Sequence, residues 1–305
     1  MAQSTTASTE APAGTSALTP ALFKRLHPRP YLDRFLQEGV RPDGRPLGAD
    51  AGEAVWRDAS VNIGSISTAP SSALIRLGNT TLVCGITLEI APPDITTPNQ
   101  GFIVPNVDLP ALCSPLFRPG PPSDEAQVLS TRLRDILIAS NVLPLASLII
   151  EPAKAAFVVY LDVVCLNFDG GILDAAVLAC VGALKNLRLP KATWDPDTGA
   201  TLCEPISEKA QGESIPLNPL PLSVTFGIFN GHLLPDPTLF ESTLCTSHIT
   251  IVVSSTTSKL LHVYQAGAPL FSAGADGVEG GGREQLKACI ALARSRAKGL
   301  LEILA

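Results

Sequence analysis

The sequence has no long apolar run, although 46% of its 305 residues are hydrophobic. Its Ala, Leu, Val and Ile residues fall in short stretches, all below the roughly 18 uninterrupted apolar residues that a membrane-spanning helix needs. We therefore expect a soluble chain with a sizeable core and no membrane as partner. At this length, two domains or one large duplicated unit are expected.

The sequence also has no excess of basic residues and no paired cysteines. A formal net charge of −6 argues against a protein that binds nucleic acid over its whole surface, and a local basic path inside an assembly stays open as an alternative. Seven cysteines are scattered without a CxxC pair, which is typical of reduced intracellular thiols rather than of a metal site. Neither a metal nor a cofactor is expected.

The first residues lack the basic and apolar segments of a secretory signal and are rich in Ser, Thr, Ala and Pro. We therefore predict a disordered tail over residues 1–28. Beyond it, strands followed by an Ala-rich helix occur twice, separated by a polar segment punctuated by Pro and Gly. This pattern predicts an α+β chain with a first domain over 29–190, a linker over 191–219 and a second domain over 220–305.

Apolar spacing locates the expected elements. Residues 92–122 are rich in Pro and Asn, and we predict a long loop there that is either functional or packed against another chain. Helices are expected at 30–38, 123–140, directly after Gly171, and at 283–303. Strands are expected at 55–66, 73–77, 80–90, 155–166, 222–229, 232–234, 248–253 and 260–264.

The strongest functional signal is the turn DGG at residues 169–171, which joins a buried strand to an Ala-rich helix. Glycines at such a junction let the backbone approach a ligand, and the free N–H groups of the first helical turn favour an anion. Yet Ile172, Leu173 and Asp174 follow, where an oxyanion would need a hydroxyl and a guanidinium. Asp174 is expected to satisfy the helix dipole and to repel an incoming phosphate. The sequence thus predicts the scaffold of a phosphate site without its ligands.

This turn, read together with RPDGR at 41–45, GNTT at 78–81 and VPNVDLP at 104–110, resembles the RNase PH family. The order and spacing of the motifs are most similar to the non-catalytic RNase PH-like subunits of the eukaryotic exosome ring. The resemblance implies an RNase PH-like fold of two β-sheet-plus-helix halves related by pseudo-duplication. It also implies partners: other RNase PH-like subunits, cap subunits, an associated catalytic nuclease, and RNA that passes through the assembled channel.

In active RNase PH enzymes, phosphate attacks the 3′-terminal phosphodiester of RNA. Cationic groups hold the phosphates, and a carboxylate-bound Mg²⁺ or a general acid assists the leaving oxygen. The resemblance places Ile172 and Leu173 where active members carry Thr and Arg. It also places Ser242 and His248 at the positions of two aspartates, and a neutral Ser and a lone His cannot replace two anionic metal ligands.

Charged residues near these positions have two interpretations each. Asp236 and Glu241 are interpreted as surface-loop carboxylates, with a cryptic metal site as the alternative. Arg118 and Arg132 lie near positions that contact RNA in active relatives, so they are either phosphate contacts on the RNA path or structural and inter-subunit residues. RPDGR at 41–45 is interpreted as a structural turn, with a functional loop as the alternative.

The resemblance and these replacements together predict a non-catalytic structural subunit of the exosome ring. It would support 3′-to-5′ RNA processing and degradation by forming the RNA channel and subunit interfaces, without being an enzyme. The alternative is a phosphorolytic 3′-to-5′ exoribonuclease with an atypical site or one shared with a neighbouring chain. A self-standing RNA-binding module would need a basic surface, which the acidic charge balance opposes. The expected location is the nucleus, including the nucleolus, and the cytoplasm.

Overall fold

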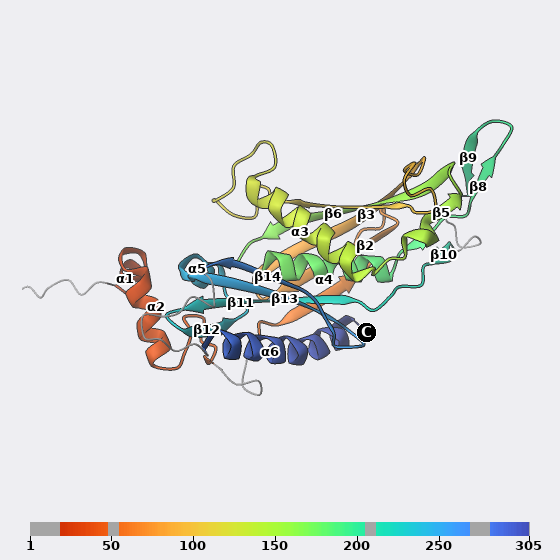
Figure 1. Ribbon diagram of the computed structural model, residues 1–305. Coiled ribbons are helices and arrows are strands. Elements are labelled where there is room, and N and C mark those ends of the chain that lie inside the picture. Colours follow the sequence, from red (N-terminus) through yellow and green to blue (C-terminus); the bar gives the residue numbers. More distant parts are fainter. Residues whose placement is uncertain (1–18, 48–54, 205–211, 269–280, 305) are drawn as a thin grey trace, which may run out of the picture.

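The computed structural model describes residues 19–47, 55–204, 212–268 and 281–304, and Figure 1 shows their arrangement. Two β-sheets lie on either side of a helical layer, and a long C-terminal helix covers the outer face of the second sheet. The α+β fold class predicted from the sequence is therefore confirmed.

The larger sheet is built around β6 (Ala155–Asn167), an almost uninterrupted apolar strand whose first five residues are all buried. It pairs antiparallel with β3 (Thr80–Ala91) on one side and parallel with β4 (Phe102–Asp108) on the other. The strand order is β1-β2-β3-β6-β4, and β5 also pairs with β6. The remaining strands of this sheet are β1 (Ala59–Ile63), β2 (Ser71–Leu77) and β5 (Ile149–Glu151).

Helix α4 (Ile172–Lys185) lies between the two sheets, and every residue from Ile172 to Leu184 is buried. Small side chains allow this close packing, since a Cβ added at Gly182 would lie only 3.3 Å from Ala73 Cβ of β2. Helix α3 (Asp124–Ser140) packs beside α4 and begins at Ser123, whose hydroxyl accepts a hydrogen bond from the Ala126 N–H. A short 3₁₀ helix, η1 (Leu145–Leu148), precedes β5.

The second sheet is fully antiparallel with the order β12-β11-β13-β14. Alternate residues of its inner strand β13 (Ser247–Ser254) point to opposite faces: Ile249 and Ile251 pack against helix α6 (Gly281–Leu304), whereas Val252 joins the core around α4. No helix in the four described ranges, α6 included, is long and apolar enough to cross a membrane. The elements of this half are β11 (Pro221–Phe229), β12 (His232–Pro235), α5 (Leu239–Leu244), β13 (Ser247–Ser254), β14 (Leu260–Gly267) and α6 (Gly281–Leu304).

Two segments predicted as loop and linker contain strands. The predicted loop at 92–122 includes β4, because pairing with β6 outweighs the unfavourable Pro and Asn content of the segment. The predicted linker at 191–219 carries a hairpin that projects from the body of the molecule (Figure 1). The strands concerned are the hairpin pair β8 (Ala192–Asp195) and β9 (Ala200–Cys203), and β10 (Glu213–Ser214), which pairs with β7 (Arg188–Leu189).

Most of residues 20–28, predicted to belong to a disordered tail, is helical instead. This region forms two short helices, and each has a proline in its first turn, where the fixed φ angle of proline suits a helix. The Lys24 ammonium lies 4.2 Å from the centre of the Phe240 ring of α5, a contact that sequence periodicity could not reveal. Residues 1–18 of the predicted tail lie outside the described residues. The two helices are α1 (Pro20–Leu26) and α2 (Pro28–Gln37).

Helix α2 should stabilise the second half of the molecule. Leu32 is fully buried in a cluster with Leu36, Phe229 and Leu234, so Leu32→Ala is expected to lower the free energy of unfolding by about 2–5 kcal/mol. Leu22→Ala is the matched control, because Leu22 of α1 is 44% exposed, and it should change stability by less than about 0.5 kcal/mol. Urea denaturation of both variants tests this, and equal effects would contradict the packing described.

Candidate functional site

The two glycines of the turn before α4 are packed against other parts of the chain. Gly170 and Gly171 adopt φ angles of +78° and +67°, a region that favours glycine. A Cβ added at Gly170 would lie 2.8 Å from the Leu239 backbone nitrogen and 2.9 Å from the Pro237 carbonyl oxygen. The glycines therefore permit close approach, as predicted, but what approaches is residues 237–239 from the second half.

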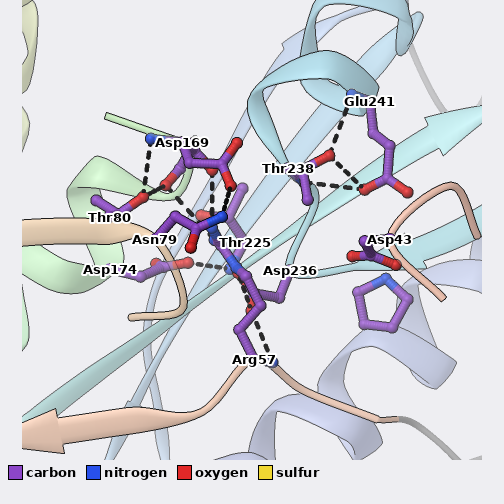
Figure 2. Close-up of polar contacts among 12 residues, drawn as sticks. Asp43, Arg57, Asn79, Thr80, Asp169, Asp174, Thr225, Asp236, Thr238 and Glu241 are labelled. Carbon is purple, nitrogen blue, oxygen red and sulfur yellow. Dashed lines mark hydrogen bonds and ion pairs between the residues drawn. The ribbon is translucent and has the colours of Figure 1, made fainter. Parts of the chain in front are cut away.

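An ion pair between Arg57 and Asp236 lies at the same turn (Figure 2). Arg57 Nε donates to Asp236 Oδ2 at 2.9 Å, and Arg57 Nη2 donates to Asp236 Oδ1. Arg57 Nη1 also donates to the Asp169 carbonyl oxygen at 2.7 Å. A Cβ added at Gly171 would lie 2.6 Å from Arg57 Nη2 and 3.5 Å from Asp236 Oδ1. The space beside the start of α4, where an anion would need to lie, thus contains the chain's own guanidinium and carboxylate.

A second buried ion pair joins RPDGR to α5. Arg41 and Glu241 are both fully buried, and Arg41 Nε donates to Glu241 Oε1 at 2.8 Å. The other Arg41 nitrogens reach the Pro235 carbonyl oxygen at 2.6 Å and the Asp236 carbonyl oxygen at 3.2 Å. Glu241 also accepts a hydrogen bond from the Thr238 N–H at 2.9 Å in the capping box of α5. These contacts support the structural interpretation of RPDGR.

The interpretation of Asp236 and Glu241 as surface-loop carboxylates is wrong, because both are buried. Burial disfavours the charged form of Asp236, but the hydrogen bonds and charge of Arg57, with the charge of Arg45, outweigh it and lower the pKa of Asp236. Arg45 Nη2 additionally donates to the Asp236 carbonyl oxygen at 3.0 Å. Both carboxylates are engaged by arginines, and no three His, Cys, Asp or Glu side chains form a potential metal site in the described part of the chain.

The structure brings Ser242 and His248 together. Ser242 Oγ of α5 lies 3.0 Å from His248 Nε2 of β13, so the two positions that the resemblance links to paired aspartates are neighbours here. Burial lowers the pKa of His248, which favours the neutral imidazole. This pair offers a hydroxyl and a neutral ring where Mg²⁺ would require anionic oxygen ligands.

Asp174 is directed into the protein and not toward an incoming phosphate, which corrects the expectation of direct repulsion. Its Oδ2 accepts a hydrogen bond from the Thr225 N–H of β11 at 2.7 Å (Figure 2). Burial raises the pKa of Asp174 to about 6, with a smaller contribution in the same direction from the Asp236 charge. Ile172 and Leu173 are likewise buried, so the first turn of α4 supplies packing and inter-half contact.

The two arginines considered for the RNA path have different surroundings. Arg132 of α3 lies with its guanidinium carbon 3.7 Å from the centre of the Tyr264 ring and donates a hydrogen bond to the Tyr264 hydroxyl. It thus links the first half to β14 of the second half. Arg118 is exposed in the segment that precedes α3. Contact of either residue with RNA stays a prediction.

A cleft of about 690 Å³ lies beside the turn, and six of its twelve lining residues are charged. Its charged lining contains equal numbers of arginines and aspartates, so it has no excess of positive charge to attract a phosphate. The charged lining residues are Arg45, Arg57, Arg76, Asp43, Asp58 and Asp169.

Comparison with known proteins agrees with this architecture. Residues 56–190 match domain 1 of the 3′ exoribonuclease family, RNase PH, and residues 220–296 match domain 2 of that family. This chain belongs to the RNase PH family. The chain is 39% identical over 283 residues to the Schizosaccharomyces pombe protein named exosome complex component rrp43, covering 92% of this chain and 96% of that protein. It is 36% identical over 228 residues to exosome complex component Rrp42 of Pyrococcus furiosus, covering 75% and 78%.

Solved structures of RNase PH-family proteins share the fold. A chain of an Archaeoglobus fulgidus exosome with RNA bound to the active site matches with a TM-score of 0.73 and 26% identity, over 90% of this chain and 96% of that one. A chain of an archaeal exosome core matches with a TM-score of 0.69 and 25% identity, over the same shares. The two-half RNase PH fold expected from the sequence is therefore confirmed.

Sequence reasoning missed Arg57, the residue that fills the turn of this RNase PH-family chain. Arg57 stands in no motif considered from the sequence, and its partner Asp236 lies 179 positions further along the chain. The available signal was indirect. A buried strand and a glycine pair without phosphate ligands imply that another group of the protein lies beside the free N–H groups in the first turn of the helix.

Gly170→Ala should destabilise the protein more than Gly44→Ala. Both glycines have positive φ angles, so each alanine should cost about 1–2 kcal/mol of backbone strain. Only at Gly170 does the added Cβ also clash with the backbone of residues 237–239, whereas nothing lies within 4 Å at Gly44. Chemical denaturation of the two variants measures the difference, and equal losses would argue against the close packing at the turn.

Asp174→Asn should change how stability depends on pH. Because the pKa of Asp174 is raised to about 6, its contribution to stability is fully present below about pH 4 and is lost as the pH rises through 6. Relative to Asp174→Asn, the unfolding free energy of the wild type should therefore fall by roughly 3 kcal/mol between pH 4 and pH 7. Urea titrations at several pH values test this, and a difference that is constant or grows with pH would contradict it.

Proposed function

We propose that this chain is a non-catalytic RNase PH-like subunit of an exosome ring. The relatives named above are exosome components, and the chain spans nearly all of the S. pombe protein and most of the archaeal one. The observation that carries the non-catalytic part of the proposal is the Arg57–Asp236 ion pair at the start of α4, together with residues 237–239 packed on Gly170. The chain's own second half occupies the place that a phosphate would need.

Phosphorolysis requires charge stabilisation that this arrangement does not offer. A phosphate nucleophile and the phosphodiester it attacks are both anionic, so the reaction needs cationic groups free to contact them. Arg57 is already paired with Asp236, and Leu173 is buried and apolar where active members carry Arg. Ser242 and His248 form a neutral pair where a metal would need carboxylates.

The role that remains is architectural. We infer that the chain completes the ring with other RNase PH-like subunits and with cap subunits, and contributes to the wall of the RNA channel. A separate nuclease then cleaves the RNA in the 3′-to-5′ direction. Location in the nucleus, nucleolus and cytoplasm stays part of this proposal.

Release of nucleoside diphosphates distinguishes this role from phosphorolysis. We expect the purified chain, given RNA, Mg²⁺ and inorganic phosphate, to release none, because the phosphate and metal positions lack the required ligands. Thin-layer chromatography of 3′-labelled RNA products gives the readout.

The assembled complex tests whether a site is shared with a neighbouring chain. Rings reconstituted with wild type, Ser242→Ala or His248→Gln should show the same phosphate-dependent release. Loss of that release in either variant, with ring composition unchanged by native mass spectrometry, would support a shared active site and contradict the proposal.

A further inference from the structure

A groove of about 540 Å³ lies between α1 and α2, at one end of the molecule (Figure 1). Three aromatic rings line it, from Phe23 of α1 and from Tyr31 and Phe35 of α2. The centre of the Tyr31 ring lies 6.2 Å from that of Phe23 and 4.9 Å from that of Phe35. All three residues are half-buried, so the groove offers a row of partly exposed aromatic surfaces.

Basic side chains surround these rings. Arg34 lines the groove as well, and its guanidinium carbon lies 5.0 Å from the centre of the Phe23 ring. The Lys24 ammonium lies 6.0 Å from the centre of the Tyr31 ring. Cations at these distances are attracted by the faces of the rings. The groove thus combines aromatic surface with positive charge.

The local charge of α1 and α2 is opposite in sign to that of the whole chain. The two helices carry four basic side chains and one acidic side chain, whereas the net charge of the chain is −6. Among the described residues, no carboxylate forms an ion pair with any of the four cations. Their charge is therefore available to an anionic ligand. The four cations are Lys24, Arg25, Arg29 and Arg34.

We propose that this groove is a binding site for single-stranded RNA, in which bases stack on the aromatic rings and the basic side chains contact phosphates. Every base has a π-face, so stacking of this kind is tolerant of sequence, and Lys and Arg contribute by neutralising phosphates. Because the chain as a whole is acidic, RNA is attracted only locally, and binding should weaken steeply as salt rises. The site goes beyond the proposed function, which assigns no ligand to α1 or α2.

The combination of rings and cations favours RNA over a protein ligand. An acidic peptide would neutralise the cations but would leave the aromatic surfaces without a stacking partner. An apolar helix of a partner protein would cover the rings but would leave four cations without anions. Single-stranded RNA supplies flat bases and phosphates together, so it satisfies both features of the groove.

Fluorescence anisotropy of a labelled short oligouridylate with the full chain tests the site. Tyr31→Leu keeps an apolar side chain but removes the ring, so it should weaken binding by about fivefold or more. Arg34→Gln should weaken binding and lower the slope of log affinity against log salt concentration by about 1. Arg294→Gln is the matched control, because Arg294 is an exposed arginine on α6 and should leave both quantities unchanged.

Three results would overturn the proposal. These are no RNA binding at low salt, equal RNA affinity in all three variants and the wild type, and binding of oligoglutamate as tight as that of oligouridylate. The last result would assign the groove to an acidic peptide instead.

Photocrosslinking of the wild type avoids dependence on the folding of a variant. RNA that contains 4-thiouridine, crosslinked to the full chain and mapped by mass spectrometry, should form adducts within residues 20–37. Adducts confined to other segments would contradict the proposal.

Discussion

The buried ion pair between Arg57 and Asp236 joins the two halves at the point where α4 begins. Arg57 precedes the first strand of the large sheet, and Asp236 follows the β12 strand of the second sheet. Their side chains meet at the glycine turn that starts α4, the helix packed between both sheets. Asp236 adopts a φ of +50°, a left-handed conformation that Asp tolerates better than most residues and that the surrounding hydrogen bonds hold in place.

The same interaction opposes the entry of an anion at the turn. Removing one partner of a buried ion pair typically costs about 3–5 kcal/mol, so a phosphate entering beside Gly171 would compete with a contact that holds the halves together. The Arg41–Glu241 pair adds a second constraint from RPDGR to α5. The glycine turn of this chain therefore serves as an internal docking point between its two halves.

The sequence predicted those helices, strands and turns that are determined by residues close together along the chain. The apolar run of β6, the glycine turn and the Ala-rich helix after it follow from side-chain spacing or turn preference. The docking contacts did not, because Arg41 and Glu241 are 200 positions apart and nothing near either residue indicates the other. Strand β4 was missed for the same reason, since only its pairing with β6 overrides the Pro-rich composition of its segment.

Phosphate binding at the turn tests the central claim most directly. Isothermal titration calorimetry of inorganic phosphate into the purified chain should show no saturable binding at millimolar concentration, since Arg57 and Asp236 satisfy each other beside the start of α4. Saturable binding would contradict the claim if it weakened in Arg57→Gln and a crystal structure placed the phosphate at Gly171. It would show that the turn still accepts an anion and that the ion pair opens to admit it.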